Sequence, residues 1–154
     1  MTVRLSDGLR TAMLETGSLE SALALGFIFI HTGAQPAAAN NAATGTLLVT
    51  IAVSDGATGL TFDAIATAGV LAKAAAETWS GTAAATGTAG WFRFNELITD
   101  KAGTTTAMAA LSTTAQRLDG SIAVSGGDLQ MSNTSIVAAA IQTISTFNLT
   151  LAAQ

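Results

Sequence analysis

Few residues of this chain are of the types that carry chemistry, and its only histidine, His31, is the first of them. His31 follows an apolar run, Phe27-Ile-Phe-Ile30, and no Gly-x-Ser-x-Gly turn that would present a nucleophile occurs. There is no cysteine, which excludes disulfides, a thiolate nucleophile and a cysteine-based metal site. We therefore expect His31 to be packed or hydrogen-bonded, and the chain to have no catalytic residue, no cofactor and no enzyme activity.

Two aspartates near expected turns, Asp119 and Asp128, are the candidates for a weak calcium site. Paired carboxylates of the glycosidase type are disfavoured, because a sugar-processing cleft normally has exposed aromatics and the chain has two Trp and no Tyr. Aspartate in turns usually bonds to its own backbone, so we assign no metal ligand. Arg93 alternates with Phe92 and Phe94 along one segment. It is predicted either to be partly covered and paired with one of these carboxylates, or to lie on the solvent face.

The charge of the chain argues against nucleic acid as a partner. There are 10 acidic and 6 basic residues, giving a net charge of −4, whereas nucleic-acid binding requires clustered Lys and Arg. Charged residues make up only 10% of the chain, against roughly 25% in typical soluble domains. Such a surface is either rich in Thr, Ser and Asn or partly hidden against other subunits.

The most apolar stretch, residues 22–30, is far shorter than the roughly 20 residues that a membrane-spanning helix needs. Asp7, Glu15 and Glu20 precede it, where a signal peptide carries positive charge and then apolar residues. We expect neither a membrane partner nor a signal peptide.

The chain is organised around the segment 87–94, Gly-Thr-Ala-Gly-Trp-Phe-Arg-Phe. At a period of two, Phe92 and Phe94 point to one side of a strand, and Trp91 and Arg93 point to the other. Large aromatic side chains in a chain of small residues must supply much of the core volume. The predicted core residues are Phe27, Phe29, Phe62, Trp79, Trp91, Phe92, Phe94 and Phe147.

The N-terminal segment predicts two short helices. Ser6 is the expected N-cap of a helix through Thr16, and Ser18 that of a second, shorter one. These helices either cover an open end of a β core or form an arm that docks on a neighbouring subunit. On the second interpretation, the candidate subunit contacts are Leu5, Leu9 and Met13.

Short strand-like segments, with turn signals about every ten residues, fill the rest of the chain. The fold class that we predict is mainly β: an antiparallel β-sandwich, jelly-roll or immunoglobulin-like, with one or two short N-terminal helices. Residues 1–154 form one domain, with a helical segment over 1–26 and the sandwich over 27–154. Asp119-Gly120 is interpreted as a hairpin turn, and 70–77 as a strand rather than a helix. The expected strands are 27–30, 46–53, 60–65, 70–77, 79–85, 87–94, 117–118, 121–124, 128–132, 136–141 and 144–151.

Several stretches resemble a family of small virion structural proteins of tailed bacteriophages. Their order and spacing carry the resemblance, which covers most of the chain after residue 27. In similar chains we expect a glycine where Ala139 or Ala140 stands and a proline near Ala152. The matching stretches are Gly45-Thr-Leu-Leu48, Ala74-Ala-Ala-Glu-Thr-Trp79, the 87–94 segment, Arg117-Leu-Asp-Gly-Ser-Ile122, Ser125-Gly-Gly-Asp-Leu129 and Ile144-Ser-Thr-Phe-Asn-Leu149.

The resemblance implies a non-enzymatic assembly protein of the virion, made in the host cytoplasm. A capsid decoration or cement protein that bridges major capsid subunits is the first expectation, and a tail, tail-fibre or baseplate component is the alternative. The expected partners are a second copy of the chain, in a dimer or trimer, and major capsid or other virion proteins. A carbohydrate-binding module or a small hydrolase is the alternative of another class, which exposed aromatics or a convergent Asp and His cluster would favour.

Overall fold

The structure is a computed structural model that describes residues 3–95 and 110–150. The sequence predicts a polar loop over 95–106, of which only Asn95 falls within these ranges. It leaves 108–111 open between a turn of helix and a strand, and residues 108 and 109 lie outside them, as does Leu151.

Both N-terminal helices form where the sequence predicts them. Helix α1 covers Asp7–Glu15 and helix α2 covers Leu19–Leu23. In α1 the hydroxyl of Ser6 accepts a hydrogen bond from the Leu9 amide, and in α2 Ser18 caps the Ser21 amide in the same way, each at 3.1 Å. These serine caps satisfy amides that have no partner inside the helix.

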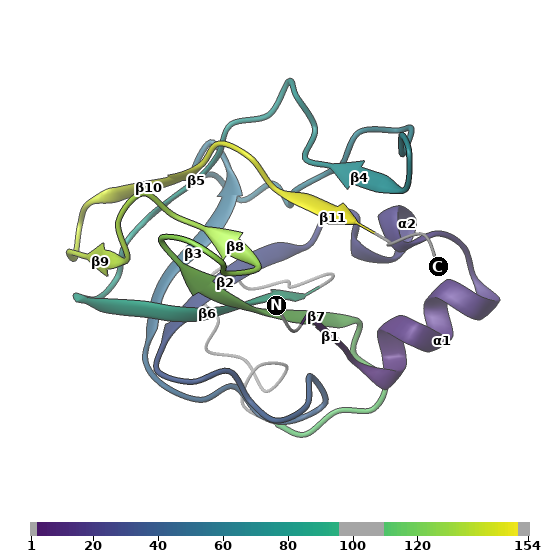
Figure 1. Cartoon of the computed structure of the whole chain (residues 1–154), viewed down its shortest axis with the longest axis horizontal. Coiled ribbons are helices and arrows are strands. Elements are labelled where there is room, and N and C mark those ends of the chain that lie inside the picture. The colour runs from purple at the N-terminus through teal and green to yellow at the C-terminus, as the bar shows by residue number, and fades with distance from the viewer. Residues whose placement is uncertain (1–2, 96–109, 151–154) are drawn as a thin grey trace.

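The rest of the fold is mainly β, as predicted. One nine-stranded sheet follows the order β1-β7-β6-β2-β3-β5-β10, with β8 beside β7 and β9 beside β6. Neighbours on this path are antiparallel, while β8 runs parallel to β7, and β4 pairs with β11 in a separate two-stranded sheet (Figure 1). The strands are β1 Arg4–Leu5, β2 Phe27–Thr32, β3 Leu47–Val53, β4 Val70–Ala72, β5 Trp79–Thr82, β6 Gly87–Asn95, β7 Arg117–Ala123, β8 Leu129–Gln130, β9 Ser135–Ile136, β10 Ile141–Ile144 and β11 Asn148–Thr150.

The main core lies on one face of this sheet and also takes in the helices. All eight aromatic residues are buried, and Phe62, Trp79, Phe92, Phe94 and Phe147 belong to the main hydrophobic cluster. Phe147 lies within 5.6–6.3 Å of the other four, measured between ring centroids. The helices contribute Leu9, Ala22 and Leu23 to the same cluster, so the N-terminal segment and the strands share one core.

The predicted fold class is supported as mainly β with two short helices, but the sandwich arrangement is not shown. The structure shows a β-rich fold with two short helices, but the main sheet is one continuous path of strands rather than two separate packed sheets. β5 and β10 lie across the core from β6 and β7 because this single sheet curves around the aromatic cluster (Figure 1).

The hairpin predicted at Asp119-Gly120 is wrong. Both residues lie inside the continuous strand β7, and neither has a positive φ. Gly120 is required because an added Cβ would lie 2.5 Å from the Phe92 ring. Asp119 points to the opposite face of the sheet and forms a buried ion pair. The Asp-Gly pair is therefore dictated by packing and charge inside the strand rather than by a turn.

Other predicted strands are shorter in the structure. The segment 60–65 forms only isolated bridges, Gly26 with Leu60 and Phe62 with Lys73, and Ala64 is exposed. The strand predicted for 70–77 ends at Ala72. The strand predicted for 136–141 is interrupted after β9, because Ala139 adopts a φ of +65°, which is incompatible with extended backbone.

Candidate functional site

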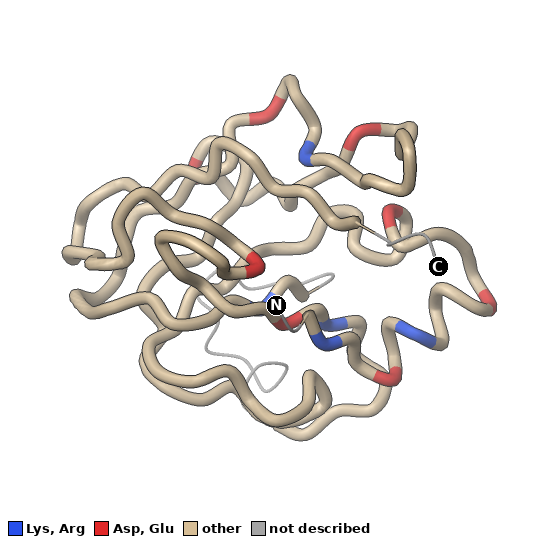
Figure 2. Tube along the Cα trace, viewed as in Figure 1, with Lys and Arg blue, Asp and Glu red and all other residues tan. Residues whose placement is uncertain are grey.

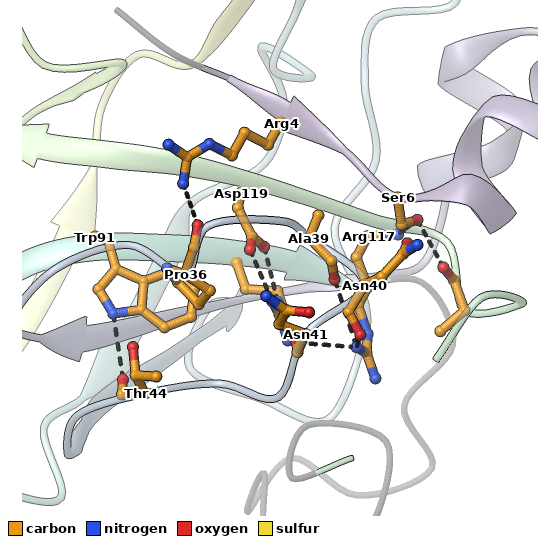
Figure 3. Close-up of polar contacts among 12 residues, drawn as sticks. Arg4, Ser6, Pro36, Ala39, Asn40, Asn41, Thr44, Trp91, Arg117 and Asp119 are labelled. Carbon is orange, nitrogen blue, oxygen red and sulfur yellow. Dashed lines mark hydrogen bonds and ion pairs between the residues drawn. The ribbon is translucent and has the colours of Figure 1, made fainter. Parts of the chain in front are cut away.

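A row of charged side chains crosses the sheet on the face away from the aromatic core. Cross-strand pairing places Arg93 of β6 opposite Asp119 of β7, and Asp119 opposite Arg4 of β1. Arg117 lies two residues before Asp119 on the same face of β7. We call Arg4, Arg93, Arg117 and Asp119 the arginine layer (Figure 3).

The centre of the arginine layer is a fully buried ion pair. Arg93 Nε and Nη2 donate to Asp119 Oδ1 and Oδ2, each at 2.7 Å, and both side chains have 0% exposure. This paired geometry matches the fork of the guanidinium to the two carboxylate oxygens. Of the two positions predicted for Arg93, the covered and paired one is confirmed, and its partner is Asp119.

Arg117 supplies a second buried positive charge, which backbone carbonyls stabilise. Its Nη1 donates to the carbonyls of Asn40 and Ala110 at 3.2 Å, and more weakly to those of Ala39 and Asn41 at 3.4–3.5 Å. Burial and the nearby Arg93 charge lower the pKa of Arg117 to about 10, although Asp119 acts in the opposite direction. Arg117 therefore remains charged at neutral pH and holds carbonyls that are distant in sequence.

His31 and Trp91 extend this face toward the end of β2. Their rings are stacked, with centroids 4.7 Å apart, and the Arg93 guanidinium lies 5.4 Å from the Trp91 ring centroid. Burial, assisted by the Arg93 charge, lowers the pKa of His31 to about 4. Neither His31 nitrogen has a hydrogen-bond partner in the structure, so the residue is packed rather than hydrogen-bonded. At neutral pH it is an uncharged ring beneath the loop described next.

The 33–46 loop, between β2 and β3, covers this face of the sheet (Figure 3). Arg4 donates to the Pro36 carbonyl, Arg117 to the carbonyls of 39–41, and Trp91 Nε1 to the Thr44 carbonyl at 3.2 Å. Two arginines and an indole N–H on the sheet thus bind carbonyls along most of the loop.

Asn40 ties the same loop to helix α1. Its side-chain oxygen accepts from the Asp7 amide at 2.9 Å, and its amide nitrogen donates to the Asp7 carboxylate at 2.7 Å. The Asn40 carbonyl also accepts from the Ser112 amide at 2.8 Å. At the far end, Thr32 and Thr46 exchange hydrogen bonds at 2.9–3.0 Å. Connections of this length without regular structure are uncommon and usually functional, and this one is fixed at both ends and in its middle.

The outer surface of the loop carries no charge. No charged residue occurs between Glu20 and Asp55, and Ala34, Ala37, Ala38 and Thr44 are exposed. Arg4 and Arg117 reach the loop from the sheet side and bind its carbonyls. The loop itself therefore presents small, uncharged side chains, while the charged Arg4, Asp7 and Arg10 line a groove beside Ala37 and Ala38.

The two aspartates considered as metal ligands do not meet. Asp119 faces the arginine layer, whereas Asp128 Oδ2 accepts from the Ser121 amide at 2.9 Å and from its hydroxyl at 2.7 Å. Asp128 lies beside Phe92 and the position of Gly120, on the core side of β7. Within 3–95 and 110–150, no three His, Cys, Asp or Glu residues are grouped as a metal site would require.

The residues predicted as subunit contacts pack mainly on their own chain. Leu9 has 0% exposure and belongs to the main core, so it is not available to a neighbour. Leu5 and Met13 are partly buried against that core and line an apolar groove together with Val3, Leu19 and Leu149. The most exposed apolar residue of α1 is instead Leu14, at 87%.

Sequence reasoning missed the 33–46 loop as a site, the roles of Asn40 and Arg117, and the second role of Ser6. Besides the predicted cap of α1, the Ser6 hydroxyl accepts from the Arg117 amide at 2.9 Å and donates to the Ala115 carbonyl at 2.7 Å. The available signal was the long charge-free stretch around Pro36, combined with arginines placed inside otherwise apolar strands.

No protein-family model, no curated protein and no solved structure matches this chain. Among the described residues, no helix has the length and apolar character needed to cross a membrane.

Proposed function

We propose that this protein is a non-enzymatic structural protein of a tailed bacteriophage virion, and that it decorates the capsid by binding across adjacent major capsid subunits. The observation that carries the proposal is the 33–46 loop, whose own side chains are uncharged and whose carbonyls are held by Arg4, Arg117 and Trp91 of the sheet. The resemblance to small virion proteins indicates the class of function, and the 33–46 loop is a surface suited to binding another protein.

A fixed loop suits a protein that must bind a lattice in many copies. Ordering a flexible loop on binding costs conformational entropy, whereas a loop that is already ordered avoids most of that cost. Here the hydrogen bonds from Arg4, Trp91 and Arg117 order the loop before any partner arrives. Binding to the particle then stabilises both the decoration protein and the lattice through mass action.

The distribution of charge also supports assembly with other proteins. Charged residues are few, and eight large apolar side chains are exposed among residues 3–95 and 110–150, including Leu14, Ile65 and Ile141 at 67–87%. We propose that the protein acts as a symmetric dimer or trimer, since closed symmetry is the commonest arrangement of soluble homo-oligomers.

The finer fold assignment belongs to the same proposal. We propose that the curved main sheet and the small β4–β11 sheet act as the two layers of a sandwich. Phe147 supports this, because it joins the end of β10 to the start of β11 and contacts rings from both sides of the core.

A sugar-binding module has less support. Such modules stack exposed aromatic rings on sugars, but all eight aromatic side chains of this chain are buried. The tail or baseplate alternative uses the same kind of protein surface, and the copy number in the particle distinguishes it.

The experiment is to add the purified protein to undecorated capsids and to measure binding and the temperature of particle rupture. We expect the wild-type chain to bind and to raise this temperature. Ala38→Lys, which places a charge on the exposed surface of the loop, should weaken binding without unfolding the protein. Thr113→Lys, at an exposed position outside the loop, is the matched control and should bind like the wild type. Absence of binding by the wild-type protein, or equal binding by Ala38→Lys, would overturn the proposal.

A further inference from the structure

The two ends of the main sheet differ in how they are protected against pairing with another strand. Exposed edge strands pair readily with other chains unless charge, proline, short length or a covering segment prevents it. At one end, β1 has only two residues, and one of them is Arg4. At the other end, β10 is Ile-Gln-Thr-Ile, without charge or proline, and no strand of the described residues pairs with its outer edge.

The strands beside β10 carry no charged residue, although the Asp55 carboxylate accepts a hydrogen bond from the hydroxyl of Thr82, which lies opposite Ile141. No charged residue follows Asp128, and the three neighbouring strands β3, β5 and β10 contain none. Figure 2 shows the result: the end of the molecule at β9 is tan, and an acidic position lies near β5. Ile141, on β10 itself, has 67% exposure.

The register of β10 on β5 indicates which backbone groups point outward. The Ala83 amide donates to the Ala140 carbonyl at 2.9 Å, and residues 141–144 continue this antiparallel ladder opposite 82–79. Since hydrogen-bonded positions alternate along an antiparallel pair, residues 142 and 144 direct their backbone groups to β5. Ile141 and Thr143 then direct theirs to the open edge, and both of these residues are exposed.

We propose that β10 pairs with β10 of a second copy of this chain, antiparallel and about a two-fold axis that passes beside Gln142. In this register Ile141 of one copy lies opposite Thr143 of the other, and their outward amides and carbonyls form the hydrogen bonds. Gln142 lies opposite Gln142, where two side-chain amides can donate to and accept from each other. Side chains of the two copies that lie on the same face of the sheet are then neighbours, and the two main sheets form one continuous sheet.

A second copy fits this edge better than an arbitrary strand for two reasons. The segment is self-complementary in the stated register, as a two-fold contact requires. Each copy carries a net charge of −4, and contact through strands without charged residues keeps most of these like charges apart. The β10 pairing is the symmetric contact that we assign to the proposed decoration protein. The pairing is argued from the strand edge itself, and only its biological use rests on the proposed function.

Light scattering and sedimentation of the purified full chain provide the first test. The wild type should form a dimer. Thr143→Lys places one ammonium group from each copy at the pairing edge, and it should raise the dissociation constant of the dimer by about tenfold or more. Thr143→Val keeps an uncharged β-forming side chain and should remain dimeric, as should Thr113→Lys. A monomeric wild type, or a Thr143→Lys protein that dimerises normally, overturns the inference.

Cross-linking tests the register directly, because the chain contains no cysteine. In Gln142→Cys, the two introduced side chains lie opposite each other at a spacing that a disulfide can bridge. Mild oxidation should therefore give a covalent dimer, while Gln130→Cys, an exposed glutamine on β8, should remain largely monomeric under the same conditions. Equal cross-linking of the two variants contradicts the register.

The particle-binding assay separates the two proposals. Dimers that do not bind particles leave the β10 contact intact and remove the capsid function. A monomeric wild-type chain whose binding to capsids is abolished by Thr143→Lys would show that the edge pairs with a capsid strand, and would overturn the second copy as its occupant.

Discussion

Replacing Asp119 by Asn tests whether the arginine layer holds the fold and its loop together. The substitution keeps the size of the side chain but removes its charge, so that buried Arg93 loses its ion-pair partner and buried Arg117 loses a nearby negative charge. Breaking a buried, hydrogen-bonded ion pair in this way costs roughly 3–5 kcal/mol. The upper part of this range is appropriate here, because both side chains of the pair have 0% exposure and Arg117 adds a further buried positive charge.

The assay is urea and thermal unfolding followed by circular dichroism. A loss of this size corresponds to a fall in the melting temperature of about 6–20 °C for a chain of this length. Asp7→Asn is the matched control, since Asp7 pairs with Arg10 while both side chains are 45–62% exposed, and it should lower the melting temperature far less, because solvent screens an exposed ion pair. Equal losses in the two variants would refute the reasoning, because they would mean that burial of the Arg93 pair contributes nothing.

The remaining predictions concern single side chains. Trp91→Ala should cost roughly 3–5 kcal/mol of unfolding free energy, because it uncovers His31 and Arg93 and frees the Thr44 carbonyl; a urea midpoint shifted no more than by a surface Thr→Ala variant would contradict this. His31 binds a proton in the unfolded chain near pH 6.5 but in the folded chain only near pH 4, so stability is complete above pH 6.5 and falls by about 3 kcal/mol as the pH drops toward 4. His31→Gln should abolish that part of the pH dependence in unfolding titrations, and an unchanged slope would disprove the assignment. Ala139→Gly should raise stability by about 1 kcal/mol, because glycine tolerates the φ of +65° that alanine adopts there; a lower melting temperature than the wild type would count against it.

The sequence predicted those parts of the fold that depend on local patterns. Serine caps followed by apolar spacing located both helices, and β-branched runs located β2 and β3. The alternation around Arg93 indicated that it lies on the face opposite Phe92 and Phe94, which the structure shows.

The failures come from contacts that are distant in sequence. Asp119-Gly120 has the composition of a turn, but Arg93 and the Phe92 ring, both on β6, require a carboxylate and a missing Cβ at those two positions. Similarly, nothing local shows that the carbonyls of 39–41 are bound by Arg117, far along the chain. The glycine expected at 139 or 140 did carry structural information, since Ala139 has a positive φ.

The arginine layer also accounts for part of the charge-poor surface. Three of the six basic residues, Arg4, Arg93 and Arg117, are used inside the protein, where two of them are fully buried and Arg4 is partly so. Charge that would normally keep a surface solvated is instead used to fix a loop. Such an arrangement suits a protein whose surface is covered by neighbours in an assembly.

The most direct test of the proposed capsid function is whether this chain is present in purified bacteriophage particles, and in how many copies. Quantitative mass spectrometry, with the major capsid protein as the internal reference, gives this ratio. A decoration protein is predicted to be present in a fixed, near-stoichiometric proportion to the major capsid protein. A handful of copies per particle would contradict capsid decoration and favour a tail component, and complete absence from the particle would contradict a virion role altogether.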